Sequence, residues 1–244
     1  MRAIILAGGY AKRLLPVTQF FPKSLLPVAG KPIINYLLEN LEKTKISRIY
    51  VSTNKKFENN FKHWYSALRN RRNIKLCVEE SNCEENKLGA LKALNALVVN
   101  EKINDDTLII AGDNIFDFQL NALIDFYNKK RSSVIAFKDI KNIEKVRERF
   151  GVGVINSKKK LVDFEEKPKN PKSSLVSTGC YILTKNDLKK LDDYMKDGNN
   201  GDAPGNFIKW LHKKSDVFCY VFNEKWFDIG NMDAYKEANF SYKQ

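Results

Sequence analysis

The alternation of two hydrophobic patterns is the feature that most constrains the fold of this chain. Short apolar runs, typical of buried strands, are followed by longer segments whose apolar residues recur three and four positions apart, as in amphipathic helices. The expected strands are residues 2–6, 48–53, 74–78 and 107–111, and the expected helices are residues 33–43, 57–68 and 89–99. This β-α-β-α-β-α-β order predicts an α/β fold with a Rossmann-like, doubly wound and mostly parallel sheet.

The remainder of the chain contains more strands and shorter connections. Strands are expected at residues 133–138, 152–156, 161–165, 177–183 and 217–222, and helices at residues 187–195 and 206–213. Short connections between consecutive strands favour antiparallel pairing, so we expect a mixed second layer beside the parallel sheet. The 244 residues contain no internal repeat and no low-complexity linker. We therefore predict a single domain, residues 1–244, with one half at about 1–130 and the other at about 131–244.

The composition excludes several classes of protein. Hydrophobic residues make up 43% and charged residues 29% of the chain, which is typical of a soluble globular protein. No stretch approaches the roughly 20 apolar residues that span a bilayer, and the first apolar run is shorter than the roughly 7–15 residues of a signal-peptide core. We therefore expect no membrane partner and a cytoplasmic location. The four cysteines are widely spaced and the chain has two histidines, so no zinc site is expected.

The formal net charge is +13, and two explanations of it remain open. The lysines and arginines occur in short, scattered runs, which is typical of a solvated surface. They could also produce a field that attracts phosphorylated substrates. None of the runs is interleaved with aromatic residues, as a groove that stacks bases would be, so no nucleic-acid partner is expected. Whether the chain forms a homo-oligomer is left open by the sequence.

A glycine pair follows the first expected strand, at the edge where parallel sheets bind their ligands. Gly8 and Gly9 lack side chains, so the backbone N–H groups after the strand can approach phosphate oxygens closely. Arg13 and Lys23 then supply two cations, a planar guanidinium that can bind bidentately and a compact ammonium. The spacing matches neither the P-loop nor the G-x-G-x-x-G dinucleotide turn. The segment is therefore predicted to be an anion-binding loop of a different type.

Three carboxylates stand at positions where they could contact a ligand. Asp113 lies in a Gly-Asp-Asn turn after the strand at residues 107–111, where a carboxylate can hold Mg²⁺ against phosphate oxygens, although such turns are common structural elements as well. Glu166 precedes Lys167, and such a pair can bind the hydroxyls and the phosphate of a phosphorylated sugar, or form a solvated, salt-bridged turn. Asp228 could bind a metal or could cap the last helix of the chain.

Taken in order, these segments resemble the signature of the sugar-1-phosphate nucleotidylyltransferase family, and they are most similar to its glucose-1-phosphate thymidylyltransferase-like members. The resemblance is carried by residues 6–18, 22–28, 112–116, 150–152, 165–168, 177–179 and 226–231. It implies the nucleotide-diphospho-sugar transferase type of fold, with a nucleotide-binding first half and a second half that binds the sugar phosphate. It also implies an enzyme of nucleotide-sugar biosynthesis that transfers a nucleoside monophosphate from an NTP to a sugar-1-phosphate, with Mg²⁺ as cofactor and pyrophosphate as the second product.

The same resemblance implies roles for individual residues. Arg13 would stabilise charge at the reacting phosphates, and Lys23 would contact the α-phosphate of the nucleotide. The full set comprises the catalytic residues Arg13, Lys23, Asp113 and Asp228, the nucleotide-binding residues Leu6, Ala7, Gly8, Gly9, Gly89 and Asp113, the sugar-phosphate-binding residues Gly151, Glu166, Lys167, Thr178 and Gly179, and the Mg²⁺ ligands Asp113 and Asp228.

The substrates follow less directly from the residues. The stretch at residues 79–87, in which relatives carry a base-reading glutamine, contains none; its candidate side chains are Glu79, Glu80, Glu84 and Glu85. An ionised carboxylate can only accept hydrogen bonds, so it suits the ring N–H of thymine, uracil or guanine better than the ring nitrogen lone pair of adenine or cytosine. The resemblance ranks dTTP and UTP before GTP and favours glucose-1-phosphate as the sugar.

Two further departures from the family pattern affect what is expected. Relatives with a Leu-Gly-Thr-Ala-Gly motif differ from this chain, which reads Leu-Gly-Ala-Leu-Lys at residues 88–92. The sequence also ends soon after Asp228, so we expect a short form without a C-terminal extension. The alternatives to the enzyme are a non-catalytic regulatory subunit that binds nucleotide sugars and a basic nucleic-acid-binding protein. A regulatory subunit should have lost Arg13, Lys23 or an aspartate, and this chain retains them all.

Overall fold

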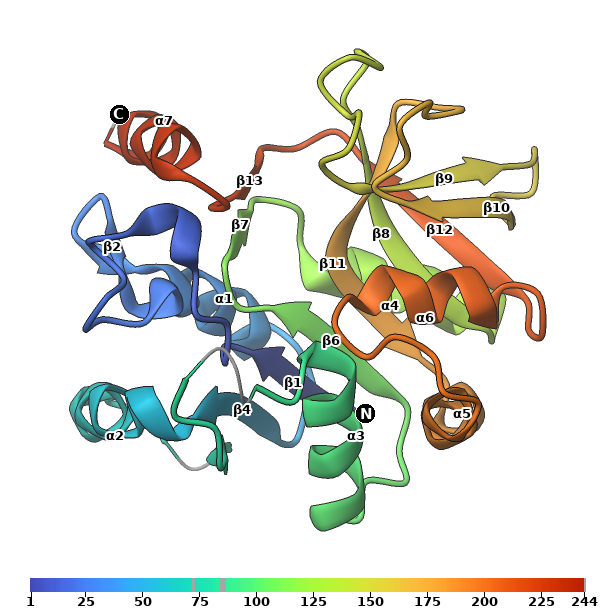
Figure 1. Cartoon of the computed structure of the whole chain (residues 1–244). Helices are drawn as coiled ribbons and strands as arrows, with labels where there is room; N and C mark the ends of the chain where they lie inside the picture. Colours follow the sequence, from blue (N-terminus) through green and yellow to red (C-terminus); the bar gives the residue numbers. More distant parts are fainter. Residues whose placement is uncertain (72, 84–86, 244) are drawn as a thin grey trace.

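A central sheet organises the computed structural model, which describes residues 1–71, 73–83 and 87–243 (Figure 1). Within the described residues the sheet has nine strands. They are β1 (Arg2–Leu6), β4 (Ile49–Asn54), β5 (Ile74–Glu79), β6 (Thr107–Ala111), β8 (Ser133–Asp139), β9 (Gly151–Ile155), β10 (Leu161–Glu166), β11 (Leu175–Leu183) and β12 (Val217–Phe222).

The parallel part of the sheet has the order β5-β4-β1-β6, and all three neighbouring pairs are parallel. The chain passes from β1 to β4 on one side and later returns to place β6 on the other side of β1. The order therefore reverses between β1 and β6, and a sheet of this kind binds ligands beside that point, outside the carboxyl ends of the strands. The predicted doubly wound, mostly parallel sheet is confirmed.

The strands of the second half extend this same sheet rather than forming a separate layer. β11 pairs antiparallel with β6, with Cys180 opposite Ile110, and β8 and β9 in turn pair with β11. β12 pairs in parallel with β8, and β10 pairs antiparallel with β9. The expected second layer thus differs from the structure, because the open edge of β6 obtains its backbone hydrogen bonds from β11.

Helices cover both faces of the sheet, which explains why its strands are apolar on both sides. One face packs against α1 (Ile33–Glu42), α2 (Glu58–Ala67) and α4 (Leu120–Lys130), and the other against α3 (Ala90–Asn100), α5 (Lys185–Lys196) and α6 (Pro204–Leu211). In β1, Ala3 and Ile5 contact the first group and Ile4 contacts the second. Such two-sided burial produces a continuous apolar run in place of an alternating one.

The C-terminal segment folds back onto the segment that follows β1. A two-stranded ribbon pairs β7 (Asn114–Phe116) with β13 (Trp226–Asp228), and α7 (Met232–Tyr242) then packs beside the hairpin of β2 (Pro27–Val28) and β3 (Lys31–Pro32). The Tyr235 hydroxyl donates to the carbonyl of Pro27 at 2.6 Å. In Figure 1, α7 and β13 accordingly lie next to the blue N-terminal segment.

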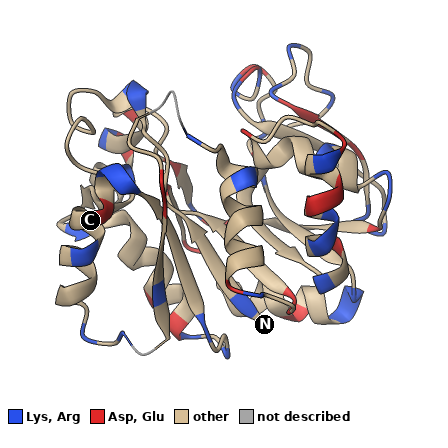
Figure 2. Ribbon diagram, turned by 60° about the horizontal axis from the view of Figure 1, so that its bottom comes forward, with Lys and Arg blue, Asp and Glu red and all other residues tan. Residues whose placement is uncertain are grey.

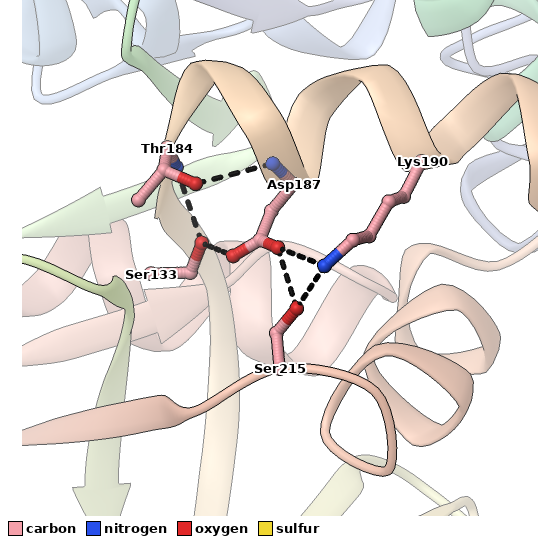
Figure 3. A network of polar contacts seen from close by, with 5 residues as sticks. All are labelled: Ser133, Thr184, Asp187, Lys190 and Ser215. Atoms are coloured by element: carbon pink, nitrogen blue, oxygen red, sulfur yellow. Dashed lines mark hydrogen bonds and ion pairs between the residues drawn. The ribbon is translucent and has the colours of Figure 1, made fainter.

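A buried polar network fixes the start of α5 against two strands (Figure 3). Thr184 caps the helix by accepting from the amide of Asp187 at 3.1 Å. The carboxylate of Asp187 accepts from Ser133, the first residue of β8, and from Ser215 before β12, both at 2.6 Å, and pairs with Lys190 at 2.9 Å. Burial acts to raise the pKa of Asp187, but these donors outweigh it and lower the pKa.

Charged residues are spread over both halves of the molecule (Figure 2). Lysines stand beside aspartates and glutamates on helices, as in the pairs Lys62–Glu58 on α2 and Lys196–Asp192 on α5. Among the described helices, none is both long and apolar enough to cross a bilayer.

Candidate active site

A cavity of about 600 Å³ lies at the carboxyl ends of β1, β5 and β6, beside the reversal of strand order. Segments from both halves of the chain line it. Of the residues predicted from the sequence, it is lined by Leu6, Ala7, Gly8, Gly9, Arg13, Lys23, Gly89, Asp113, Lys167 and Asp228. The remaining predicted residues, Gly151, Glu166, Thr178 and Gly179, lie outside this lining.

The glycine pair presents bare backbone to the cavity. The backbone amide of Ala7 donates to the backbone carbonyl of Ser52 on β4 at 2.8 Å. The buried side chain of Asn54 donates to the carbonyl of Gly8 at 2.8 Å. A Cβ atom on Gly9 would meet no atom of the described protein within 4 Å. Packing within the protein therefore does not require a glycine at this position, whereas close approach of a ligand to the backbone would.

Arg13 projects from a short 3-10 helix, η1 (Lys12–Leu14), that begins after this loop. The neighbouring Leu14 is buried and anchors the turn in the apolar cluster under α7. Arg13 itself is exposed, lines the cavity and has no ion-pair partner among the described residues. The guanidinium is thus available to an anion in the cavity.

Lys23 and Asp113 meet as an ion pair in the cavity. Lys23 opens the 3-10 helix η2 (Lys23–Leu25), and Asp113 follows β6. Gly112 makes this approach possible, because its amide donates to Leu6 at 2.8 Å and a Cβ on it would come within 2.9 Å of the same carbonyl oxygen. The turn after β6 is therefore pressed against the end of β1.

Asp228 is brought next to Asp113 by the ribbon of β7 and β13. Its register places Asp228 opposite Asn114, and the amide of Ile229 donates to the carbonyl of Asp113 at 3.1 Å. The side chain that caps α7 is Asn231, which accepts from Ala234 at 2.9 Å. The alternative in which Asp228 caps the last helix is therefore excluded.

The two carboxylates differ in their titration. Burial acts to raise the pKa of Asp113, but the Lys23 ammonium, the local backbone N–H and the Asn114 amide outweigh it and lower the pKa. For Asp228, burial and the negative charge of Asp113 raise the pKa to about 6, although Lys23, Arg13 and Arg149 oppose the rise. Two acidic groups therefore share a desolvated site that favours additional positive charge.

This donor set fits a magnesium ion. Mg²⁺ prefers hard oxygen ligands and is usually held by one or two carboxylates, with waters and substrate phosphates completing its shell. Asp113 and Asp228 supply two carboxylates, and a cation between them would relieve the repulsion that raises the pKa of Asp228. In the described part of the chain, no group of three or more histidine, cysteine, aspartate or glutamate side chains could hold a metal. The remaining ligands would have to come from substrate or solvent.

Lys167 reaches the cavity from a strained turn after β10. Its φ of 48° lies in the left-handed region, which is uncommon for a residue with a side chain and is often found at functional sites. The amide of Lys167 donates to the carbonyl of Phe150 at 3.1 Å, and that of Glu148 donates to Pro168 at 3.0 Å. The turn is thus fixed to the segment that precedes β9.

Glu166 is half-buried and lies in a notch formed by two glycines. A Cβ on Gly205, at the start of α6, would lie 1.8 Å from its carboxylate, and a Cβ on Gly151 would lie 2.8 Å from it. Burial raises the pKa of Glu166, and the charge of Lys167 opposes this rise. The Glu166 carboxylate can therefore occupy this position only because Gly151 and Gly205 have no side chains.

Thr178 and Gly179 have roles within the sheet. Thr178 is buried, and its hydroxyl donates to the carbonyl of Ala136 at 2.9 Å. Gly179 has a φ of +71°, and a Cβ on it would come within 2.8 Å of the Ala111 side chain. These contacts explain both residue types without a ligand.

Packing within the protein also requires a glycine at position 89, which lines the cavity. Its φ is +85°, and a Cβ on it would approach the Asp202 carboxylate at 2.7 Å and the Gly201 carbonyl at 2.8 Å. The amide of Leu91, in the first turn of α3, donates to Gly201 at 2.9 Å. The loop before α6 therefore packs on the start of α3 and brings Asp202 into the cavity lining.

One of the four candidate base-reading carboxylates lines the cavity. Glu79, at the end of β5, accepts a hydrogen bond from the Ser81 hydroxyl, which in turn accepts from the Tyr10 hydroxyl at 3.2 Å. The side chain of Glu80 is 79% exposed and lies 3.9 Å from Lys55. The other two candidates, residues 84 and 85, fall outside the described residues.

Several cavity residues were not predicted from the sequence. They are Tyr10, Ser24, Ser52, Glu148, Arg149, Asp202 and Asn231. Tyr10, Ser24 and Asn231 lie inside the motif segments at residues 6–18, 22–28 and 226–231, and Arg149 directly precedes the Phe-Gly-Val motif at residues 150–152. Ser52 lies on β4, and Glu148 and Asp202 come from loops whose position depends on long-range packing.

Comparisons with known proteins show which proteins this chain resembles. The chain is 32% identical over 239 residues to a Sulfolobus acidocaldarius protein assigned as a mannose-1-phosphate guanyltransferase, covering 97% of this chain and 62% of that protein. It is 32% identical over 252 residues to a glucose-1-phosphate adenylyltransferase of Mycoplasma mobile, covering 98% and 66%. A solved Bacillus anthracis structure, assigned as a glucose-1-phosphate thymidylyltransferase in complex with a sucrose, has a TM-score of 0.83 at 26% identity, covering 100% of this chain and 96% of that one.

The curated relatives are longer than this chain, which spans about half to two thirds of their length. The family likeness nevertheless extends over the whole described fold. The model of the nucleotidyl transferase family matches residues 2–244, from the first strand through the helix that follows Asp228. The resemblance found in the sequence motifs is confirmed, and the chain belongs to the nucleotidyl transferase family.

Proposed function

We propose that this chain transfers a nucleoside monophosphate from an NTP to a sugar-1-phosphate and releases pyrophosphate. The observation that carries the proposal is the composition of one cavity, which joins a bare glycine backbone, the unpaired Arg13 and the carboxylates of Asp113 and Asp228. Such a site can hold two phosphorylated substrates and neutralise their charge. The names of the relatives, which describe transferases of this kind, support it.

The reaction is an in-line displacement at phosphorus. An anionic oxygen of the sugar phosphate forms a bond to the α-phosphorus of the NTP. The bond from that phosphorus to the bridging oxygen of the β-phosphate breaks, and pyrophosphate leaves with the electron pair. The attacking oxygen already carries negative charge, so no general base is needed. The task of the protein is to position two anions against their repulsion and to stabilise the charge that develops.

Seven of the predicted residues are proposed to take part in this task. The backbone at Gly8 and Gly9 would bind the triphosphate, and Arg13 would donate to the phosphate oxygens where charge develops. Lys23 would contact the α-phosphate, and Lys167 would hold the phosphate of the sugar. Asp113 and Asp228 would bind Mg²⁺, which supplies positive charge at the phosphate oxygens when it is bound.

The proposed nucleotides are dTTP and UTP, with Glu79 as the side chain that reads the base. Support comes from the family resemblance and from the position of Glu79 in the cavity. GTP is the second candidate, and the chemistry of Glu79 favours it. A carboxylate can accept from both N1–H and N2–H of guanine, whereas thymine and uracil offer a single N3–H between two carbonyl oxygens. Adenine and cytosine would place a ring lone pair against the carboxylate.

The proposed sugar substrate is glucose-1-phosphate, or a close relative of it. Glu166 is proposed to bind its hydroxyls next to the phosphate held by Lys167, and the half-buried notch at Gly151 and Gly205 supports a specific role for this carboxylate. Asp202 lines the cavity and is a second acceptor for hydroxyl groups.

A matrix of five triphosphates (dTTP, UTP, GTP, ATP and CTP) against sugar-1-phosphates, read out by pyrophosphate release in the presence of Mg²⁺, tests this function. We expect at least one pair to give turnover that the Asp228→Asn variant lacks. Equal pyrophosphate release by the wild type and this variant would point to a contaminating activity. The absence of turnover with every pair would refute the proposed function.

A further inference from the structure

Arg149 is a cation of the cavity to which the proposed reaction has not yet given a part. It lies in the segment between β8 and β9 and lines the same cavity as Arg13 and Lys167. Its side chain is exposed, and among the described residues no carboxylate forms an ion pair with it. Arg147, two positions earlier, is also exposed but pairs with Glu144 at 2.9 Å. An unpaired guanidinium in an anion-binding cavity is a candidate ligand for a phosphate group.

The backbone holds Arg149 beside the turn that carries Lys167. The amide of Arg149 donates to the carbonyl of Val146 at 3.1 Å, and Val146 is fully buried in an apolar cluster under β9. The next residue, Phe150, accepts from the amide of Lys167 at 3.1 Å. The two cations therefore belong to hydrogen-bonded neighbouring segments, both from the second half of the chain.

A continuous set of side-chain contacts joins Arg149 to the carboxylate pair. The guanidinium lies 5.2 Å from the ring centre of Phe150, and this ring packs at 5.4 Å against the indole of Trp226. The indole N–H donates to Asn114 at 2.6 Å, and the amide of Asn114 donates to the Asp113 carboxylate at 2.9 Å. The orientation of Arg149 is thus supported by the same side chains that orient Asp113.

Arg149 shares the cavity with the second carboxylate, Asp228, and with two other cations, Lys23 and Arg13. Lys23 and Arg13 come from the loops that follow β1, next to the glycine pair. Arg149 comes from the second half of the chain, as Lys167 does, and both line the cavity.

We propose that Arg149 is a catalytic residue that binds the phosphate of the sugar-1-phosphate together with Lys167. The inference rests on the proposed function. A guanidinium can bind two oxygens of one phosphate, which fixes its orientation as well as its position. This would aim the remaining oxygen at the α-phosphorus and offset the repulsion between the two anionic substrates. Arg13 and Lys23, beside the bare backbone of the glycine pair, are left to the triphosphate.

The test compares three variants under the conditions of the active pair found in the matrix, with glucose-1-phosphate as the first probe. Arg149→Ala should raise the KM for the sugar-1-phosphate at least about tenfold and lower kcat/KM about a hundredfold, with the KM for the NTP changed by less than about twofold. Arg149→Lys should recover part of the loss, because an ammonium is a single point charge. Arg147→Ala is the matched control from the same segment and should behave as the wild type.

Added guanidinium ion supplies a second readout. It should restore part of the activity of Arg149→Ala and none of that of Asp228→Asn, because only the first variant lacks a guanidinium. Thermal melting checks that each variant is folded. If Arg149→Ala does not fold, the test uses Arg149→Lys instead: a raised KM for the sugar-1-phosphate supports the inference, and an unchanged KM contradicts it.

Three results would overturn the inference. The first is an Arg149→Ala variant whose KM for the sugar-1-phosphate is unchanged. The second is a raised KM for the NTP instead of the sugar-1-phosphate. The third is a fall in kcat alone that added guanidinium ion does not restore. The last would mean that Arg149 acts only through Phe150 and Trp226 on Asp113. If the wild type released no pyrophosphate with any pair, the proposed function itself would fail. An active wild type with a normal Arg149→Ala variant would remove only the role of Arg149.

Discussion

Asp228 lies opposite Asn114 in the ribbon of β7 and β13, and the hydrogen bond from Ile229 to Asp113 closes the same pairing. One short strand from the middle of the chain and one from near its C-terminus thereby bring two carboxylates to the cavity. Burial disfavours the charged form of both, and the negative charge of Asp113 is a further cause of the raised pKa of Asp228.

The first prediction is that these aspartates act as one unit. Asp113→Asn and Asp228→Asn should each lower kcat/KM by at least about a hundredfold, and the double variant should be little worse than either, because both are proposed to hold the same ion. Activity should be lost in EDTA and return with Mg²⁺ or Mn²⁺. Multiplicative effects of the two substitutions would contradict a shared ion.

Substitution of Arg13 should affect activity, and substitution of its neighbour Leu14 should affect stability. Arg13→Ala should lower kcat/KM about a hundredfold, roughly 3 kcal/mol, with an unchanged Tm, because the exposed guanidinium contributes no packing. Leu14→Ala should destabilise the fold by about 2–5 kcal/mol, because its side chain is 1% exposed. Kinetics and thermal melting of both variants provide the check. Near-normal turnover by Arg13→Ala would refute its assigned role.

Glu79 should control the choice of base. Glutamine offers a donor beside an acceptor, which matches the N3–H and a carbonyl oxygen of thymine or uracil. Glu79→Gln should therefore shift the ratio of kcat/KM values toward dTTP and UTP, relative to GTP, by about ten- to hundredfold. Glu80→Gln is the matched control, because that side chain is exposed, and should leave the ratio unchanged. If ATP or CTP is the best wild-type substrate by tenfold or more, a carboxylate does not read the base.

Glu166 should affect the sugar phosphate and not the nucleotide. Glu166→Ala should raise the KM for the sugar-1-phosphate and leave NTP binding, measured by calorimetry without sugar, nearly intact. Gly205→Ala should act in the same direction, because its Cβ would occupy the position of the Glu166 carboxylate. Weakened NTP binding with an unchanged KM for the sugar would show that the two pockets have been exchanged.

The buried network at the start of α5 should contribute to stability and to its dependence on pH. Asp187→Ala leaves the buried Ser133 hydroxyl and the half-buried Ser215 hydroxyl without their acceptor and should cost about 2–3 kcal/mol in urea unfolding. Asp192→Ala, on the same helix, breaks an exposed pair with Lys196 and should cost no more than about 0.5 kcal/mol.

The pH dependence of the Asp187 contribution has a defined sign. The folded-state pKa of Asp187 is lowered, so its stabilisation is complete above the unfolded value of about 3.9 and is lost as the pH falls through the folded value. The difference in unfolding free energy between the wild type and Asp187→Ala should therefore narrow below about pH 4. If this difference in unfolding free energy stays constant from pH 7 to pH 3, the ionised Asp187 carboxylate does not supply the stabilisation.

The helices and strands of the central sheet could largely be predicted from the sequence, because burial on two faces gives strands such as Arg2–Leu6 a continuous apolar run. The helix at Leu120–Lys130 was missed. The three-residue strands Asn114–Phe116 and Trp226–Asp228 were missed because so short a segment has no measurable periodicity. Strand order was only partly predictable, since the pairing of β11 with β6 depends on an edge that no local pattern encodes.

The amino-acid sequence was enough to predict the chemical groups that are present: the bare backbone at Gly8 and Gly9, the cations at Arg13 and Lys23, and an aspartate after β6. Each is a local property of residue type and position after a strand. Which of these groups come together could be seen only in the folded chain. The tertiary structure distinguished Glu79 from the exposed Glu80, excluded Asp228 as a helix cap, and brought Arg149 into the cavity. The physical reason is that these contacts arise from pairing and packing between distant segments, whose free energies depend on the whole fold and not on neighbouring residues.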